Sequence, residues 1–229
     1  MIERIDHICV VVENIDKARQ VLLEIGCPFL WDGPFGDIWV SGFSIGAVNL
    51  ELVSMDVLQT ARKMFGIDQI AFDPGELTTT LKALRRAGFN PSEAVEGEFH
   101  CDISGVHTDW RWRTADVDRD KHLPGLPCFL CEYYAPYQHY GKSVPSSPLR
   151  FVELEVALPE PQAAVPIYER ALNVQSTVAE NGYLLPVGDT LIRLVQGDGV
   201  SLVLQPLVTG LPLQKISAVI PGIGWQEGP

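Results

Sequence analysis

The chain has 229 residues, of which 46% are hydrophobic and 20% are charged, and its formal net charge at pH 7 is −12. This apolar content suffices for a packed core and excludes a disordered chain, while the acidic balance argues against nucleic acid as a partner. No apolar run approaches the ~20 residues of a membrane span. The start of the chain has neither the basic region nor the apolar core of a signal peptide. We therefore expect a cytoplasmic protein that does not enter a membrane.

An internal repeat organises the first half of the chain. The segment that begins at Ile5 returns 62 residues later, at Ile67, without a gap. Five pairs of residues are identical at this offset: Ile5/Ile67, Asp6/Asp68, Ile8/Ile70, Leu22/Leu84 and Gly26/Gly88. The repeat predicts that residues at matching positions of the two copies form the functional site.

The first copy reads as a βαβββ module. A strand at about 4–12 precedes a helix that Asn14 caps, and an apolar stripe runs along this helix until Gly26 ends it. The stripe consists of Ile15, Ala18, Leu22 and Ile25. Three strands with Gly-containing turns follow, at 31–40, 42–45 and 47–53.

The second copy repeats this plan after a short connecting helix at 55–65. Its strand at 67–73 and its helix at about 75–87 precede strands near 99–104, 107–115 and 127–134. The charged stretch 116–125 reads as a loop insertion.

A third, weaker copy follows a linker at 136–148. Its predicted elements are a strand at 151–158, a helix at 159–172 and strands near 183–187, 190–196 and 200–206. Ile216 to Ile220 suggests the first strand of a fourth copy. The fold class is thus α+β, with paired modules 1–54 and 66–135 in a domain 1–135, a third module at 149–207 and a tail at 208–229.

Strand side chains alternate between the two faces of a sheet, so parity predicts which residues oppose the helices. Ile8, Val10 and Val12 are assigned to the helix face, which turns His7 and Cys9 to the other side. The same reasoning turns Gln69 and Glu51 away from the helices. In the last strand of the second module, Phe129, Cys131 and Tyr133 are assigned to the inside and Glu132 to the opposite face. One His, one Gln and two Glu then meet in a cleft.

This layout resembles the vicinal oxygen chelate superfamily, in particular glyoxalase I, methylmalonyl-CoA epimerase and uncharacterised glyoxalase-like proteins. The resemblance rests on Ile5-Asp6-His7-Ile8 and on the strand around Glu51, and it covers residues 1–135. It implies a divalent metal, Ni²⁺, Zn²⁺, Co²⁺, Mn²⁺ or Mg²⁺, bound by the residues that match the family pattern: His7, Glu51, Gln69 and Glu132.

Such a metal would stabilise an enediolate formed from a small α-oxygenated carbonyl substrate, as in a lyase or an isomerase. Glu132 is the predicted general base, with Glu51 as the alternative. The iron site of ring-cleaving relatives has a second His, and Gln69 stands in that place here. The alternative function is a metal-free protein that sequesters a ligand, of the bleomycin-resistance type.

Aromatic residues are expected to form the wall of the cleft. Trp39 and Trp112 are the predicted substrate contacts, and His139 follows the last strand of the cleft closely enough to join them. Of the five cysteines, Cys128 and Cys131 have the spacing of a metal or redox pair. Because residues three apart in a strand point to opposite faces, we expect buried free thiols instead. The unpaired third module predicts a homodimer.

Overall fold

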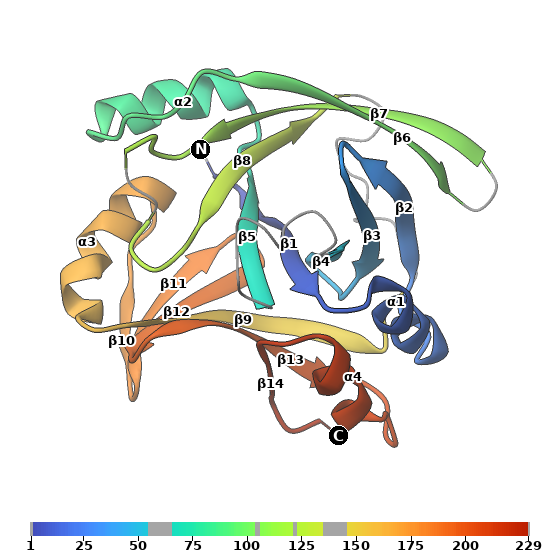
Figure 1. Ribbon diagram of the computed structural model, residues 1–229. Helices are drawn as coiled ribbons and strands as arrows, with labels where there is room; N and C mark the ends of the chain where they lie inside the picture. The colour runs from blue at the N-terminus through green and yellow to red at the C-terminus, as the bar shows by residue number, and fades with distance from the viewer. Residues whose placement is uncertain (1, 55–65, 104–105, 121–122, 135–145, 229) are drawn as a thin grey trace.

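The computed structural model describes residues 2–54, 66–103, 106–120, 123–134 and 146–228 of the chain. Two mixed sheets share one hydrophobic core, which includes Ile8 of the first sheet and Leu154 of the second (Figure 1). The predicted connecting helix at 55–65 and most of the predicted linker at 136–148 lie outside the described residues. In the described part of the chain, no helix is long and apolar enough to cross a membrane.

The first sheet has eight strands in the order β2-β3-β4-β1-β5-β8-β7-β6. Its first module comprises β1 (Arg4–Val12), α1 (Ile15–Glu24), β2 (Phe29–Phe35), β3 (Ile38–Ser44) and β4 (Asn49–Ser54). Its second module comprises β5 (Gly66–Asp73), α2 (Leu77–Arg86), β6 (Val95–Ile103), β7 (Val106–Asp116) and β8 (Cys128–Tyr133). The predicted βαβββ plan is confirmed for both copies.

The register between β1 and β5 confirms the repeat. These antiparallel strands join the two modules, and they pair His7 with Ala71 and Cys9 with Gln69. At the repeat offset of 62, Gln69 corresponds to His7 and Ala71 corresponds to Cys9. The two pairs are therefore equivalent, and His7 and Gln69 occupy matching places in the two modules. The matching glycines also agree, since Gly26 and Gly88 follow α1 and α2 with φ of 84° and 89°. Only glycine adopts such angles at little cost, which explains why both helices end there.

One detail of the first module differs from the prediction. The segment predicted as one strand at 31–40 contains a turn at Gly36 and Asp37, which separates β2 from β3. Gly36 has a φ of 58°, which suits a tight turn. The helix boundary was predicted closely: Asn14 caps α1, and its side chain accepts a hydrogen bond from the Lys17 N–H.

The first sheet curls until its two end strands meet. β2 and β6 lie side by side although the strand order places them at opposite ends of the sheet (Figure 1). Phe35 of β2 and Phe99 of β6 contact each other edge to face, with 6.4 Å between ring centroids. The sheet is therefore nearly a closed barrel, and its inner face has a hydrophobic cluster of its own that includes Trp31 and Trp110.

The second sheet has six strands in the order β10-β11-β12-β9-β13-β14. Its elements are β9 (Leu149–Leu158), α3 (Pro161–Leu172), β10 (Thr177–Ala179), β11 (Gly182–Val187), β12 (Thr190–Gln196), β13 (Gly199–Pro206), α4 (Leu213–Val219) and β14 (Ile223–Trp225). The strand predicted at Ile216 to Ile220 is wrong, because this segment belongs to α4 and its C-cap. The predicted division into domains stays a prediction.

Candidate functional site

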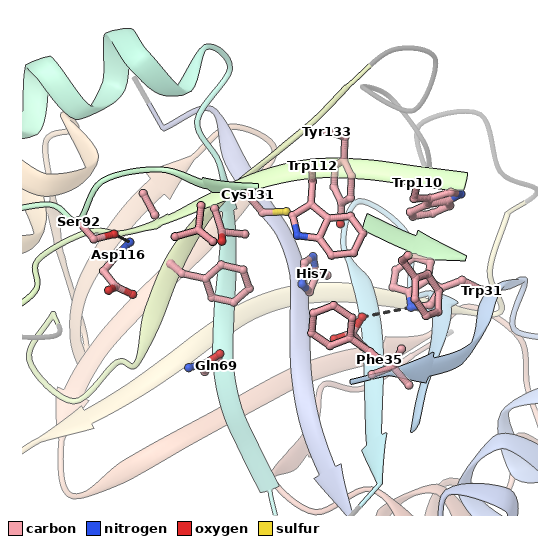
Figure 2. Close-up of a pocket in the computed structure, with 17 residues that line it drawn as sticks. His7, Trp31, Phe35, Gln69, Ser92, Trp110, Trp112, Asp116, Cys131 and Tyr133 are labelled. Carbon is pink, nitrogen blue, oxygen red and sulfur yellow. Dashed lines mark hydrogen bonds between the residues drawn. The ribbon is translucent and has the colours of Figure 1, made fainter. Parts of the chain in front are cut away.

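A cavity of about 360 Å³ lies inside the curled first sheet (Figure 2). Its walls are mostly aromatic, and they come from both modules. The rings that line it are Trp31, Phe35, Phe99, Trp110, Trp112, Phe129 and Tyr133. Trp31 and Trp110 contact each other with their centroids 5.4 Å apart, and Trp110 meets Tyr133 edge to face at 5.8 Å. Such walls suit a flat, largely apolar ligand.

Three of the four predicted metal ligands line this cavity: His7, Glu51 and Gln69. His7 and Glu51 come from neighbouring parallel strands, β1 and β4, and Gln69 comes from β5. The repeat and the strand parity thus placed these three side chains on the correct face.

Glu132 does not line the cavity, so its predicted position is wrong. Its carboxylate forms an ion pair with Arg113 and accepts a hydrogen bond of 3.3 Å from the Leu77 N–H at the start of α2. It therefore lies on the helix face of β8, and its neighbours Cys131 and Tyr133 face the cavity instead.

The strand register shows which residue takes the expected place of this carboxylate. In the first module, Glu51 pairs with Cys9 on β1. The equivalent of Cys9 on β5 is Ala71, and Ala71 pairs with Phe129 on β8. The second module therefore offers an aromatic ring where the first offers Glu51.

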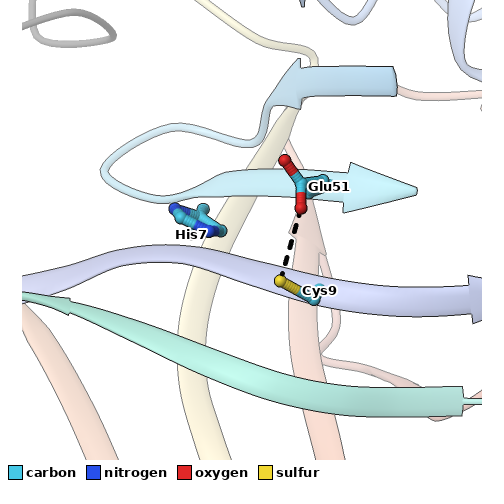
Figure 3. A group of neighbouring side chains, drawn as sticks. All are labelled: His7, Cys9 and Glu51. Atoms are coloured by element: carbon cyan, nitrogen blue, oxygen red, sulfur yellow. Dashed lines mark hydrogen bonds between the residues drawn. The ribbon is translucent and has the colours of Figure 1, made fainter. Parts of the chain in front are cut away.

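Cys9 adds a potential ligand that the sequence analysis did not include. Its thiol, the His7 ring and the Glu51 carboxylate each offer a ligand atom, and these three atoms lie within 4.8 Å of one another (Figure 3). The Cys9 thiol donates a weak hydrogen bond of 3.5 Å to Glu51 Oε1. The signal was present in the sequence, since His7 and Cys9 are two residues apart on one strand and share a face.

The Glu51 carboxylate and the His7 ring are each held in place by a hydrogen bond to a neighbouring side chain. Trp31 Nε1 donates a hydrogen bond of 3.1 Å to Glu51 Oε2. His7 Nδ1 lies 2.9 Å from Asp6 Oδ2, and Asp6 also pairs with Arg4. Adjacent residues of a regular strand point to opposite faces, but the β1–β5 register shifts between Ile5 and His7, which brings the Asp6 carboxylate to the histidine.

Burial and the neighbouring charges have opposite effects on the pKa of His7. Burial lowers the pKa of His7, but the hydrogen bond with Asp6 and the negative charges of Glu51 and Asp6 outweigh it, so the net pKa is raised. When Nδ1 donates its proton to the Asp6 carboxylate, Nε2 is the ring nitrogen available to a ligand.

Two other groups stay neutral: Tyr133, which lines the cavity, and Cys9, which lies beside Glu51. Burial, followed by the Glu51 charge, raises the pKa of the Cys9 thiol well above its ordinary value. Burial also raises the pKa of Tyr133, and the neighbouring Cys131 adds to this effect. Without a metal, the Cys9 side chain is therefore a thiol, and the Tyr133 hydroxyl is a hydrogen-bond donor.

The other predicted site residues lie in different places. Trp112 lines the cavity. Trp39 lies on the outside of β3, where it is 42% exposed and donates a hydrogen bond of 2.9 Å to Asp32. His139 lies outside the described residues. Cys128 and Cys131 are buried free thiols on opposite sides of β8, as predicted, because Cys128 packs in the shared core while Cys131 faces the cavity.

No profile of a protein family and no curated protein sequence matches the chain. Solved structures do share its fold. A hypothetical protein from Staphylococcus aureus gives a TM-score of 0.71 at 10% identity, covering 90% of this chain and 92% of that chain. A catechol 2,3-dioxygenase gives a TM-score of 0.56 at 14% identity, covering 95% of this chain and 75% of that chain. The Mn(II)-bound glyoxalase from Novosphingobium aromaticivorans gives a TM-score of 0.51 at 11% identity, with coverages of 95% and 70%. The chain therefore shares the fold of these three proteins.

Proposed function

We propose that this protein is a divalent-metal-dependent enzyme whose reaction takes place at the floor of the cavity. One observation carries the proposal: His7, Cys9 and Glu51 bring three ligand atoms within 4.8 Å of one another. Metal–ligand distances of about 2.0–2.3 Å allow two ligands of one ion to be at most about 4.6 Å apart. The cluster therefore needs only a small closing movement to hold an ion.

The donor set favours some metals over others. A thiolate, an imidazole and a single carboxylate suit Zn²⁺ or Co²⁺ better than Mg²⁺ or Mn²⁺, which prefer oxygen ligands. Gln69 faces the same cavity from β5 and offers a further oxygen. The solved glyoxalase of similar fold contains Mn²⁺, so a preference for thiophilic ions would distinguish this chain from it.

When bound here, the metal would act as a Lewis acid toward a substrate with neighbouring oxygen atoms. The residues of the chain supply the rest. Of the two carboxylates that line the cavity, Glu51 is the one beside His7 and Cys9, so it takes the role of general base that the sequence analysis gave first to Glu132. Trp31 donates a hydrogen bond to its Oε2, and the neutral Tyr133 hydroxyl can donate to a substrate oxygen. We propose a lyase or isomerase reaction on a small carbonyl compound.

The proposal is tested by metal analysis of the protein purified without chelators, beside the variants His7→Ala, Cys9→Ser and Glu51→Gln. We expect about one metal ion per chain in the wild type and its loss in each variant. Glu132→Gln is the matched control, because it makes the same change of charge on a carboxylate that lies outside the cavity. The absence of metal from the wild type, with none taken up on titration with Zn²⁺ or Co²⁺, would refute the proposal.

Cobalt offers a sharper test of the Cys9 ligand. A thiolate bound to Co²⁺ produces a charge-transfer absorption in the near ultraviolet, and this band should be absent from Cys9→Ser but present in Cys131→Ser. Both thiols are buried near the cavity, so the pair of variants separates a ligand from a neighbour.

A second candidate function is a metal-free protein that sequesters a ligand. It is favoured by Phe129, which stands where a second carboxylate would be expected, and by the aromatic walls of the cavity. A wild-type protein that never takes up metal but binds aromatic compounds would support this function over the enzyme.

We also infer that the second sheet is a third βαβββ module followed by a shortened fourth. The order β10-β11-β12-β9 matches β2-β3-β4-β1, and β13, α4 and β14 follow in the manner of β5, α2 and β8. Arg193 pairs with Glu155 as Glu51 pairs with Cys9, and it forms a 2.8 Å ion pair with Glu153. An arginine in this place argues against a second metal site. The homodimer stays a prediction, which light scattering tests.

A further inference from the structure

The charged groups that line the cavity are of one sign apart from His7. Glu51 and Asp116 both line it, and Asp116, which is exposed, lies beside Ser92 and away from Trp31 and Trp110 (Figure 2). No lysine or arginine lines the cavity within the described part of the chain. A negative ligand would therefore find no lysine or arginine here to pair with, and burying an unpaired charge is costly.

The arginines nearest to the cavity are turned away from it by the alternation of β7. Trp112 and Thr114 face inward on this strand, so Arg111 and Arg113 point outward. Arg113 pairs with Glu132 and Glu76, and the Arg111 guanidinium lies 5.7 Å from the centroid of the Tyr134 ring. Both cations are thus engaged on the outer side and do not serve the cavity.

Asp116 is positioned at the cavity by its main chain. Its N–H donates a hydrogen bond of 2.8 Å to Ser92 Oγ, and its C=O accepts one of 3.3 Å from the Ser92 N–H. Within the described residues, no hydrogen bond or ion pair uses the Asp116 carboxylate. The carboxylate therefore remains available to a charged group of a ligand.

The size of the cavity limits what enters it. Ligand pockets span about 300–1,000 Å³, and the cavity of about 360 Å³ is at the small end of this range. A coenzyme A thioester does not fit inside, whereas a molecule of one or two rings does. Indole and phenyl faces also attract cations, which adds to the pull of the carboxylates.

We propose that the cavity selects a small aromatic molecule with a positively charged end, whose ring lies among the tryptophans and whose amine or ammonium group faces Asp116. The inference rests on the proposed use of this cavity as the substrate site, but it does not require the metal. The acidic net charge of the whole chain would steer such a ligand toward the protein and repel its anionic analogues.

The test uses two probes with the same ring and opposite charge, tryptamine and indole-3-propionate, in calorimetric titrations of the whole protein. We expect the amine to bind about 10-fold more tightly, from a cation–π contact and an exposed ion pair. Asp116→Asn should reduce this preference about 3-fold, and added salt should reduce it further, because the carboxylate is exposed. Glu98→Gln is the matched control, since Glu98 is exposed on β6 and does not line the cavity.

Tighter or equal binding of the anion, or binding of neither probe, would overturn the inference. It would also be overturned if Asp116→Asn and Glu98→Gln changed the preference equally. The same titrations on protein treated with a chelator separate this result from the metal proposal. A preference for the amine in a protein that never holds metal would contradict the proposed enzyme and leave the ligand class standing.

Discussion

A glycine beneath Trp31 provides a direct test of how the site is held together. Gly42 of β3 pairs with Trp31 on one side and with Glu51 on the other. A Cβ at this position would overlap with the Trp31 indole ring, so Gly42→Ala must displace the ring. Displacement would break the 3.1 Å hydrogen bond from Trp31 Nε1 to Glu51 Oε2. The substitution therefore acts on Glu51 without changing any charge.

The expected loss of stability has two parts. Overfilling a packed position costs about 1–3 kcal/mol, and loss of a hydrogen bond to a charged group costs about 1.5–3 kcal/mol. Because the two overlap, we expect the free energy of unfolding to fall by about 2–4 kcal/mol. In a chain of this size that lowers Tm by roughly 4–16 °C. Metal affinity should fall about 10- to 100-fold, as it does when the support of a ligand is removed.

Gly97→Ala is the matched control, because Gly97 also lies against a tryptophan ring. A Cβ at Gly97 of β6 would overlap with the Trp112 ring, but Trp112 is only half-buried and does not contact Glu51 through a described hydrogen bond. Its ring can move toward solvent, so we expect a loss of about 1 kcal/mol and unchanged metal affinity. Thermal unfolding and calorimetric titration with Zn²⁺ measure both quantities. Equal effects of the two substitutions on metal affinity would refute the reasoning.

Three further predictions follow from the contacts around the site and the helices. Asp6→Asn should lower metal affinity about 10- to 100-fold in a calorimetric titration, because Asp6 orients the His7 ring; unchanged affinity would show that the ring needs no such support. Hydrogen bonds from the first turn of α2 lower the pKa of Glu76 from 4.5 to about 2, so its contribution to stability is complete above about pH 4.5 and is lost as the pH falls toward 2. Glu76→Gln should therefore lower Tm at pH 7 but not near pH 2, and a constant difference across this range would contradict the prediction. Burial raises the pKa of Cys27 to about 11 and of Cys128 to about 12, so neither thiol should react with a disulfide reagent at pH 8 until the protein unfolds; mass spectrometry of the labelled protein checks this.

Strand β8 explains why the sequence predicted one half of the site and missed the other. Parity assigns faces reliably when one face of a strand is apolar and the other is polar, as for β1 near His7. In β8, Leu130 packs in the shared core, while Phe129 and Tyr133 line an aromatic cavity, so both faces are apolar. Such a strand shows no alternation of apolar and polar residues from which its two faces could be assigned. Assigning Phe129, Cys131 and Tyr133 to the inside turned Glu132 toward the cavity, whereas the structure pairs it with Arg113 on the neighbouring strand.

The fold was more predictable than the site because it rests on longer patterns. The 62-residue repeat predicted two equivalent modules, and the capping residue and final glycine bounded α1 closely. Ile216 to Ile220 was misassigned, because a short apolar run does not separate a strand from a buried helix. The contact of Asp6 with His7 depends on a bulge in β1, and no pattern in the sequence predicts a bulge at this position.

The meeting of β2 and β6 has a consequence for how quickly the cavity exchanges its contents. Every other neighbouring pair of strands in the first sheet is joined by a ladder of main-chain hydrogen bonds, but among the described residues β2 and β6 meet through side chains such as Phe35 and Phe99. This seam is the weakest line around the barrel. A ligand that exchanged through this side of the cavity would need the seam to part, so its residence time would depend on local opening of the protein. Amide hydrogens along the seam should accordingly exchange with solvent faster than those of β1 and β4.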